Sequence, residues 1–241
     1  MTEKLYRDDA YARSATAKIL SVTDRGGIIL DRTVFYASAG GQPGDIGSID
    51  IPNLGSIAIA TAVYDADKAT IVHVPAQPLP STPAPGTDAT VTLDWPNRHK
   101  LMRMHTGLHL LCSLVKFPVT GGQIGADEGR LDFDIADADA IDKDRLTTEL
   151  NALIGANHAV TEQWITDAEL EANPNLVRTM AVKPPMGSGR VRLVLIGESG
   201  SIDRQPCGGT HVRNTSEIGQ LAVTKIEKKG KLNRRIRVAF I

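Results

Sequence analysis

A change of pattern at Asp94-Trp95-Pro96 constrains the fold of this 241-residue chain more than any other feature. Before it, short segments rich in β-branched residues alternate with glycine- or proline-containing turns, as in the ranges 15–22, 56–64 and 87–94. Many short strands at close spacing are typical of a small barrel or sandwich. After it, apolar residues recur every three or four positions to about Lys116, which predicts an α-helix. Asp suits the N-cap of that helix and Pro its first turn.

Helices and antiparallel strands are expected to alternate in the rest of the chain. The pattern predicts a hairpin over 121–135, a helix over 142–154, and strands over 158–165, 190–196, 218–228 and 232–241. Because no strand–helix–strand rhythm appears, an α+β fold is favoured over a parallel sheet. We therefore expect an N-terminal β-barrel-like domain at residues 1–92, followed by an α+β domain at residues 93–241.

The composition is typical of a globular protein, and we expect a cytoplasmic location. Hydrophobic residues make up 41% and charged residues 23%, which excludes a disordered or low-complexity chain. The longest apolar runs, such as 191–196, are far shorter than the roughly 20 residues of a membrane span. Met1-Thr2-Glu3-Lys4 lacks the apolar core of a secretory signal. Two cysteines, Cys112 and Cys207, form no disulfide framework, which fits a reducing compartment.

Positive charge is concentrated at the end of the chain. Residues 1–92 contain 7 Lys and Arg against 10 Asp and Glu, a net charge of −3, whereas residues 93–241 contain 20 against 18, a net charge of +2. Lys and Arg bind phosphate groups strongly and with little sequence preference. A pair of strands with their charged side chains in solvent would have the same run of Lys and Arg without binding any partner. The candidate contacts to an anionic partner are Lys225, Lys228, Lys229, Lys231, Arg234 and Arg235.

Two pairs of potential metal ligands share a spacing of four residues. His105 and His109 lie on the predicted helix, where residues four apart face the same side. Cys207 and His211 enclose Gly208-Gly209, whose backbone freedom allows a tight fold that directs both side chains inward. Three imidazoles and one thiolate suit a tetrahedral divalent metal, above all zinc. The four side chains are therefore predicted to hold one zinc ion per chain.

Each pair taken alone has an ordinary explanation. A single His-x-x-x-His pair is a weak signal, and a free cysteine is more often a small buried hydrophobe. Helical zinc proteases need Glu directly after the first histidine, where this chain has Thr106. Zinc deaminases need Pro-Cys-x-x-Cys, but here Pro206-Cys207 is followed by Gly-Gly-Thr-His. Both of those chemistries are disfavoured.

The motifs that carry the four candidate ligands resemble those of the alanyl-tRNA editing family. This family comprises free-standing deacylases and the editing domain of alanyl-tRNA synthetase. Its signature corresponds here to His105-Thr-Gly-Leu-His109 and Cys207-Gly-Gly-Thr-His211. The glycine-rich run at 39–47, the strand at 122–133 and the basic hairpin at 225–235 are also similar to the family. In length the chain is most similar to the stand-alone, medium-length form. Ala39 departs from the family, in which many members have a third glycine.

The resemblance implies hydrolysis of the ester that joins serine or glycine to the 3′ adenosine of tRNA(Ala), with zinc as the cofactor. It also implies that Gly40, Gly41 and Gln42 fold over the substrate, although the run could instead be a plain hairpin turn. Thr106 and Gln123 are candidates for a hydrogen bond to the serine hydroxyl. Such a bond would disfavour alanine, which leaves the polar group unpaired.

Several alternatives remain open at this level. Threonyl-tRNA editing domains use a similar His/Cys set, so another mischarged tRNA could be the substrate. A non-catalytic tRNA-binding module could use zinc for stability alone. A catalytic zinc would either activate water, if one ligand is loose, or orient the substrate. The orienting role is preferred because activated aminoacyl esters need little acceleration.

Overall fold

The computed structural model describes residues 1–135, 141–178, 189–230 and 232–241. The chain divides into two compact units, Met1–His99 and Lys100–Ile241, and the division falls within helix α1 (Trp95–Leu114). The predicted domain boundary between residues 92 and 93 stays a prediction. In the described ranges, no helix combines the length and apolar character needed to cross a lipid bilayer.

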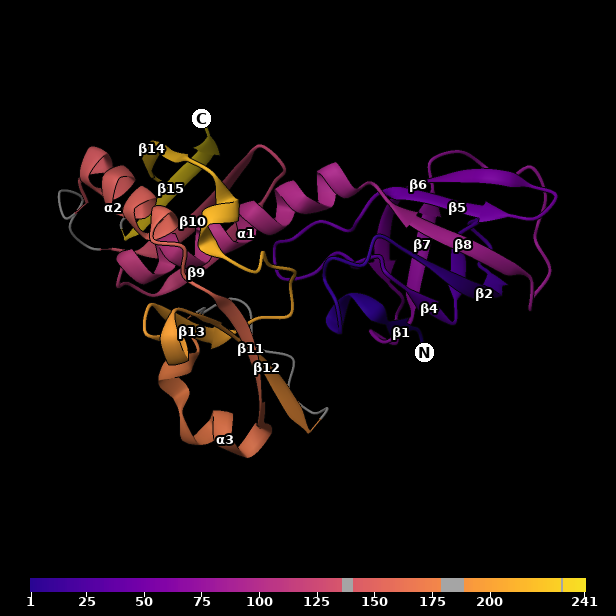
Figure 1. Cartoon of the computed structure of the whole chain (residues 1–241), viewed down its shortest axis with the longest axis horizontal. Coiled ribbons are helices and arrows are strands. Elements are labelled where there is room, and N and C mark those ends of the chain that lie inside the picture. Colours follow the sequence, from indigo (N-terminus) through magenta and orange to yellow (C-terminus); the bar gives the residue numbers. More distant parts are fainter. Residues whose placement is uncertain (136–140, 179–188, 231) are drawn as a thin grey trace. The chain divides into compact units, whose positions relative to one another are not determined.

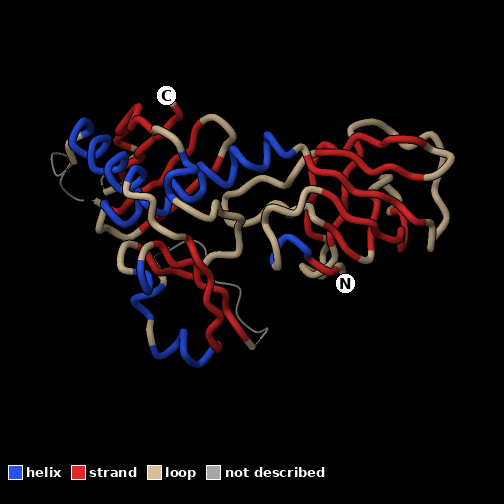
Figure 2. Tube along the Cα trace, in the orientation of Figure 1, coloured by secondary structure: helices blue, strands red, loops and turns tan. Residues whose placement is uncertain are grey.

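The first unit consists mainly of strands and loops (Figure 2). Its strands are β1 (Glu3–Lys4), β2 (Ser14–Val22), β3 (Ile28–Leu30), β4 (Arg32–Thr33), β5 (Gly47–Ile51), β6 (Gly55–Tyr64), β7 (Ile71–Pro75) and β8 (Asp88–Leu93). Six of them close a barrel in the order β2-β3-β7-β6-β5-β8, with every neighbouring pair antiparallel. The expected N-terminal barrel and the α+β class are therefore confirmed.

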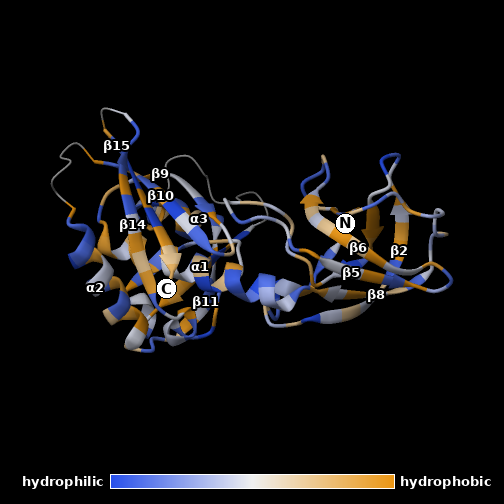
Figure 3. Cartoon of the chain, turned by 90° about the horizontal axis from the view of Figure 1, so that it is seen from above, coloured by the Kyte–Doolittle hydropathy of each residue, from blue (hydrophilic) through white to orange (hydrophobic). Residues whose placement is uncertain are grey.

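Alternation of side chains builds the core of the barrel. Along β8, Ala89, Val91 and Leu93 are buried while the residues between them are more exposed, as period-2 patterning requires. Ile19 and Ile49 complete the same apolar core from neighbouring strands. Figure 3 shows hydrophobic residues recurring along these barrel strands. The barrel interior is filled by side chains, as is usual for small barrels.

The glycine-rich run at 39–47 begins as a tight hairpin turn. Ala39 and Gln42 exchange two backbone hydrogen bonds, and Gly40 and Gly41 between them have φ angles of 58° and 84°. Two consecutive positive φ angles define a type I′ turn, which glycine adopts without strain. Gly44 is confined for another reason, because a Cβ there would lie 2.0 Å from the Ala62 carbonyl oxygen.

A fully buried ion pair joins this run to the start of α1. The Asp94 side chain accepts a hydrogen bond from the Asn97 amide, which confirms the predicted N-cap. One turn further, the Arg98 guanidinium donates from Nε to both oxygens of Asp45, at 2.9 and 3.0 Å, and also to the carbonyl oxygen of Val34. The exposed fractions of the Arg98 and Asp45 side chains are 0% and 1%. Nη1 donates to the Ala10 carbonyl oxygen, so each guanidinium nitrogen has an acceptor, and such hydrogen bonding is what allows a charge pair to be buried.

The second unit combines helices with two antiparallel sheets. Besides α1, its elements are β9 (Val119–Ile124), β10 (Glu128–Asp134), α2 (Lys143–Gly155), β11 (Val160–Thr166), α3 (Asp167–Ala172), β12 (Arg190–Ile196), β13 (Asp203–Pro206), β14 (Leu221–Lys228) and β15 (Asn233–Phe240). In the described residues, β14-β15-β10-β9 form one sheet and β11-β12-β13 another.

Side chains of helix α1, whose course is drawn in Figure 1, contact both sheets of this unit. On one side Met104 and Leu108 pack against Gly129 of β10, where a Cβ would lie 2.8 Å from the Met104 sulfur. On the other side His109 bonds to Asp203 of β13. Because α1 packs against both sheets, the face that carries His109 is held against the end of β13. The predicted ligands meet there.

Candidate metal centre and charged sheet face

Four potential ligands converge between α1 and the segment that follows β13. The ligand atoms of His105, His109, Cys207 and His211 all lie within 4.8 Å of one another. The histidine rings are in mutual contact, with the centroids of His105 and His211 4.2 Å apart and those of His109 and His211 4.6 Å apart. The three histidines are buried, and the Cys207 side chain lies 3.3 Å from Nε2 of His211 and 3.5 Å from Nε2 of His105. The two pairs of residues spaced by four in the sequence therefore come together in a single cluster.

A buried carboxylate fixes the ring of His109. Nδ1 of His109 lies 2.7 Å from Oδ2 of Asp203, and the Gln205 amide donates to the same carboxylate oxygen at 2.8 Å. With Nδ1–H donating to Asp203, Nε2 is the nitrogen left for a metal. A histidine ligand oriented by a carboxylate is the usual arrangement around zinc, and it raises the basicity of the ligand.

Thr106 fixes the ring of His211 in the same manner. Its hydroxyl donates to the Met102 carbonyl oxygen at 2.9 Å, and its oxygen accepts from Nδ1–H of His211 at 3.1 Å. The Val212 amide donates to the same oxygen. The hydroxyl hydrogen is therefore used within the helix, and Nε2 of His211 faces the cluster.

Arg192 of β12 holds the backbone around Cys207. Its Nη1 donates to the carbonyl oxygens of Cys207 and Gly209 at 2.8 and 2.9 Å, and Nη2 pairs with Glu162 of β11. Because Nη1 bonds the two carbonyls and Nη2 pairs with Glu162, one planar guanidinium holds the loop and β11 in a fixed geometry. The loop carrying Cys207 is thereby fixed to the central strand of the sheet.

The charges in the cluster favour a thiolate and metal binding. Burial alone would raise the pKa of the Cys207 thiol, but the His105 and His211 rings outweigh it and lower that pKa well below its usual value. Burial would lower the pKa of His109, yet the bonds to Asp203 and Cys207 outweigh it and raise that pKa to about 10. Burial together with the charge of His105 lowers the pKa of His211 well below normal. The cluster thus favours the thiolate form of Cys207, which is the form that binds a metal.

The donor set fits zinc. Three imidazole nitrogens and a thiolate are the ligands of a common tetrahedral zinc site. The rings of His109 and His211 are already oriented by hydrogen bonds from their far nitrogens, so little rearrangement is needed. The four residues could therefore hold one divalent metal ion.

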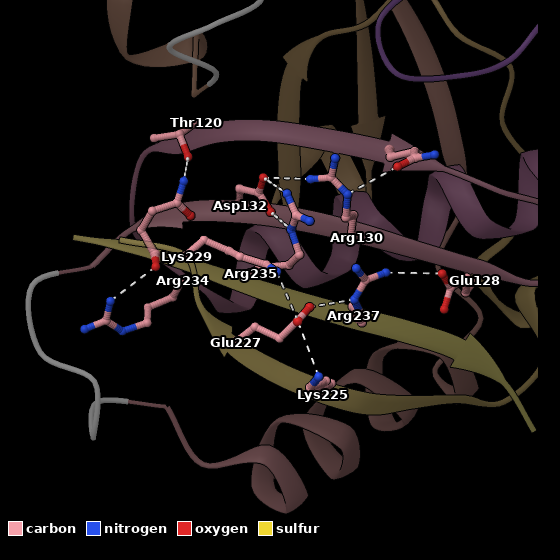
Figure 4. Close-up of polar contacts among 12 residues, drawn as sticks. Thr120, Glu128, Arg130, Asp132, Lys225, Glu227, Lys229, Arg234, Arg235 and Arg237 are labelled. Atoms are coloured by element: carbon pink, nitrogen blue, oxygen red, sulfur yellow. Dashed lines mark hydrogen bonds and ion pairs between the residues drawn. The ribbon is translucent and has the colours of Figure 1, made fainter. Parts of the chain in front are cut away.

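The outer face of the β14-β15-β10-β9 sheet carries a network of ion pairs (Figure 4). Asp132 accepts hydrogen bonds from Arg130 at 2.7 Å and from Arg235 at 2.8 and 2.9 Å. Glu227 accepts from Arg237 at 2.7 Å, with nitrogens of Lys225 and Lys229 at 3.3 Å. The hydrogen bond from Arg237, reinforced by the two lysines, lowers the pKa of Glu227 to about 2. Among the described residues, five cations thus share this face with three carboxylates, the third being Glu128, which pairs with Arg237.

Comparisons with known proteins agree with this geometry. Residues 191–237 match the model of the threonyl and alanyl tRNA synthetase second additional domain. The chain is 34% identical over 247 residues to the alanyl-tRNA editing protein AlaX-M of Methanosarcina acetivorans, with 98% of each chain covered. The chain belongs to the alanyl-tRNA editing family.

Of two further relatives, one matches the chain over its whole length and the other over a part of a larger protein. The alanyl-tRNA editing protein AlaX-M of Saccharolobus solfataricus is 29% identical over 242 residues, again 98% of each chain. An alanine–tRNA ligase of Pyrobaculum arsenaticum is 32% identical over 236 residues, which are 94% of this chain but 25% of the ligase. Alanyl-tRNA editing proteins are deacylases, so the resemblance seen in the sequence and the expectation of an enzyme are confirmed.

The structure places the other predicted substrate contacts of this editing-family chain in different settings. Thr106 is fully buried behind His211, whereas Gln123 is exposed on β9 and accepts a hydrogen bond from Arg130 at 3.3 Å. Gly40 and Gly41 form the tip of the turn in the first unit, and Gln42 beside them is buried. Contacts of these residues with substrate stay predictions.

The basic hairpin forms as expected, as β14 and β15, but its side chains differ in role. Lys225, Lys229 and Arg235 belong to the ion-pair network, and Lys228 is exposed at the end of β14. Arg234 instead points to the core side, where it is 4% exposed and donates to the carbonyl oxygens of Gly230 and Asn233. Lys231 lies outside the described residues. A role for any of them in binding tRNA stays a prediction.

Asp203, Gln205 and Arg192 are site residues that the sequence analysis missed. A signal for two of them was present, because Asp203, Gln205 and Cys207 alternate, and alternate residues of a strand share one face. Arg192 had no such signal, since its role depends on the pairing of β12 with β13.

Proposed function

We propose that this chain is a trans-editing hydrolase that removes serine, and also glycine, from mischarged tRNA(Ala) by cleaving the ester at the 3′ end. Two observations together carry the proposal. The chain is related over 98% of its length to an alanyl-tRNA editing protein. It also brings four potential ligand atoms, from α1 and from the segment after β13, within 4.8 Å of one another. The relatives' name supplies the substrate class, and the cluster supplies a reaction centre.

We propose one zinc ion per chain, held by His105, His109, Cys207 and His211. When bound, zinc would supply a Lewis acid able to take the amino group or the ester of the aminoacyl group as a fifth ligand. Because four protein side chains complete a tetrahedral set, we favour this orienting role and a water from solvent as the nucleophile. The residues behind the ligands, Asp203 and Thr106, keep each imidazole in the tautomer that exposes Nε2.

The need for such an enzyme follows from limits on molecular recognition. A pocket built for alanine cannot exclude glycine, and it rejects an added hydroxyl only by about a hundredfold. A second site that hydrogen-bonds the serine hydroxyl reverses the preference, since alanine leaves a buried polar group unpaired. Of the two candidates for that bond, Gln123 is the better one, because it is exposed while the Thr106 hydroxyl already has its partners.

The outer sheet face is the proposed contact for tRNA phosphates. Its cations are held in place by carboxylates and outnumber them, so the face is preorganised and positive. Phosphate contacts of this kind give affinity that falls with salt. Arg234 is better assigned to the core side of the hairpin, because its guanidinium is buried.

A side-by-side hydrolysis assay tests the proposal. Ser-tRNA(Ala), Gly-tRNA(Ala) and Ala-tRNA(Ala) are incubated with the chain, with and without a zinc chelator. We expect rapid release of serine, release of glycine, and slow release of alanine, all reduced by the chelator. Binding of tRNA without any turnover would instead indicate a zinc-stabilised binding module.

The matched domain model also describes threonyl-tRNA synthetases, so Ser-tRNA(Thr) is a necessary competitor substrate. If it is hydrolysed faster than Ser-tRNA(Ala), the assignment to tRNA(Ala) is wrong. Equal hydrolysis of alanine and serine from tRNA(Ala) would refute an editing role.

A further inference from the structure

An exposed tryptophan lies on the sheet that carries Cys207. Trp164 of β11 is 41% exposed, and the Arg190 guanidinium lies over its ring at 4.8 Å from the ring centroid. Its neighbour Ile165 points to the opposite face, into the apolar cluster formed with Leu193 and Leu170. The indole of Trp164 therefore lies on the other face, where a large part of it is open to solvent.

Strand pairing puts Trp164 in one row with the metal cluster. Trp164 is paired with Arg192 across β11 and β12, and the Cys207 amide donates to the Arg192 carbonyl oxygen at 3.1 Å. Residues directly opposite each other in antiparallel strands point to the same face. Two strand spacings separate the ends of the row, so the backbones of Trp164 and Cys207 are about 10 Å apart. Arg192 bridges them, with its Nη1 on the Cys207 carbonyl.

We propose that Trp164 is the stacking platform for the 3′-terminal adenine of the tRNA substrate. The inference rests on the proposed function, since it assumes that the aminoacyl ester is held at the cluster. The adenine is joined to the ribose that carries this ester, so it lies within one nucleotide of the reacting bond. An aromatic side chain one strand beyond the loop is placed to receive it.

The chemistry of the row suits an unpaired nucleotide end. Proteins bind single-stranded nucleic acid by stacking bases on aromatic rings beside a positive surface. Arg190 over the indole supplies the positive charge next to the ring, and its cation–π contact orients the ring. Arg192 keeps the row rigid, because its guanidinium is tied to both Glu162 and the Cys207 loop. The platform is thereby held at a fixed distance from the cluster.

Kinetics of Trp164 variants give the first test. Trp164→Ala should raise KM for Ser-tRNA(Ala) by about 5- to 150-fold, the factor that corresponds to one lost base stack. The value of kcat should change by no more than about twofold, because the reacting atoms are untouched. Trp164→Phe retains a stacking ring and should keep KM near the wild-type value. Phe117→Ala, which removes another exposed ring (38% exposed), is the matched control and should leave KM unchanged. Wild-type KM in Trp164→Ala would overturn the proposal.

Tryptophan fluorescence gives a second test that needs no turnover. The chain has two tryptophans, so Trp95→Phe leaves Trp164 as the sole reporter. The trinucleotide CCA should quench this fluorescence, and the dinucleotide CC should quench it far less. Equal quenching by both would overturn the proposal. If CCA quenches but Ser-tRNA(Ala) is not hydrolysed, the proposed function fails while the base site stands; hydrolysis without quenching refutes the base site alone.

Discussion

Replacing Asp203 with asparagine tests how the site holds metal. The carboxylate is 3% exposed and lies 2.7 Å from Nδ1 of His109. A hydrogen bond to a charged group is worth about 1.5–3 kcal/mol and a neutral one about 0.5–1.5 kcal/mol, so Asp203→Asn should cost about 1–1.5 kcal/mol from this contact alone. Loss of the negative charge behind a metal-bound imidazole adds to that. Removal of such supporting groups typically weakens metal binding by 10- to 100-fold, about 1.4–2.7 kcal/mol.

The assay is competition for zinc between the protein and a chromogenic chelator at fixed pH. Asp203→Asn should raise the zinc dissociation constant by about 10- to 100-fold. Asp127→Asn is the matched control, because Asp127 is exposed and its carboxylate forms a surface ion pair with Lys100. Its dissociation constant should equal that of the wild type. If Asp203→Asn bound zinc as tightly as the control, the carboxylate would not orient His109, and the assigned ligand geometry would be wrong.

Three further predictions concern stability, pH and the Cys207 loop. Asp45→Asn leaves the Arg98 charge buried without its partner and should destabilise the first unit by about 3–5 kcal/mol in urea unfolding. Burial lowers the pKa of His73 to about 4, so the unfolded chain takes up a proton near pH 6.5 before the folded chain does. Stability is therefore lost as pH falls from 6.5 to 4, by about 3 kcal/mol, and His73→Gln should flatten this dependence. Arg192→Lys replaces the guanidinium, whose two terminal nitrogens bond the loop carbonyls and Glu162 at once, by a single ammonium nitrogen, and should release zinc about fivefold faster, measured by chelator trapping.

Each of these has a result that contradicts it. A loss below about 1 kcal/mol in Asp45→Asn would mean that the pair is solvated, as surface pairs are. The same acid sensitivity in His73→Gln and wild type would assign the effect to other groups. Unchanged zinc release in Arg192→Lys would show that the guanidinium does not hold the loop in place.

Local patterns predicted most of the secondary structure because they reflect local physics. The repeat of Leu101, Met104 and Leu108 gave α1, and all three are buried. The four-residue spacings predicted the ligand cluster, since a helix and a glycine turn each orient two side chains without help from distant residues. Short elements such as α3 and β13 carried too few residues for a periodic signal.

Roles that depend on distant pairing could not be read from the sequence. Arg234 and Arg235 are adjacent and chemically identical, yet one is buried and the other bonds to Asp132 on the outer face. Which of them faces inward is fixed by the register of β15 against β10, where Phe133 lies opposite Arg234. The support of Arg192 for Cys207 likewise requires β12 and β13 to be paired.

The most direct test of the central claim is the rate at which serine is released from Ser-tRNA(Ala) as zinc is added back to metal-free protein. The rate should rise linearly and reach its plateau at one zinc per chain. The same titration with His109→Ala should bind less zinc and restore little activity. Full hydrolysis by protein that contains no zinc, or by His109→Ala at the wild-type rate, would contradict the account.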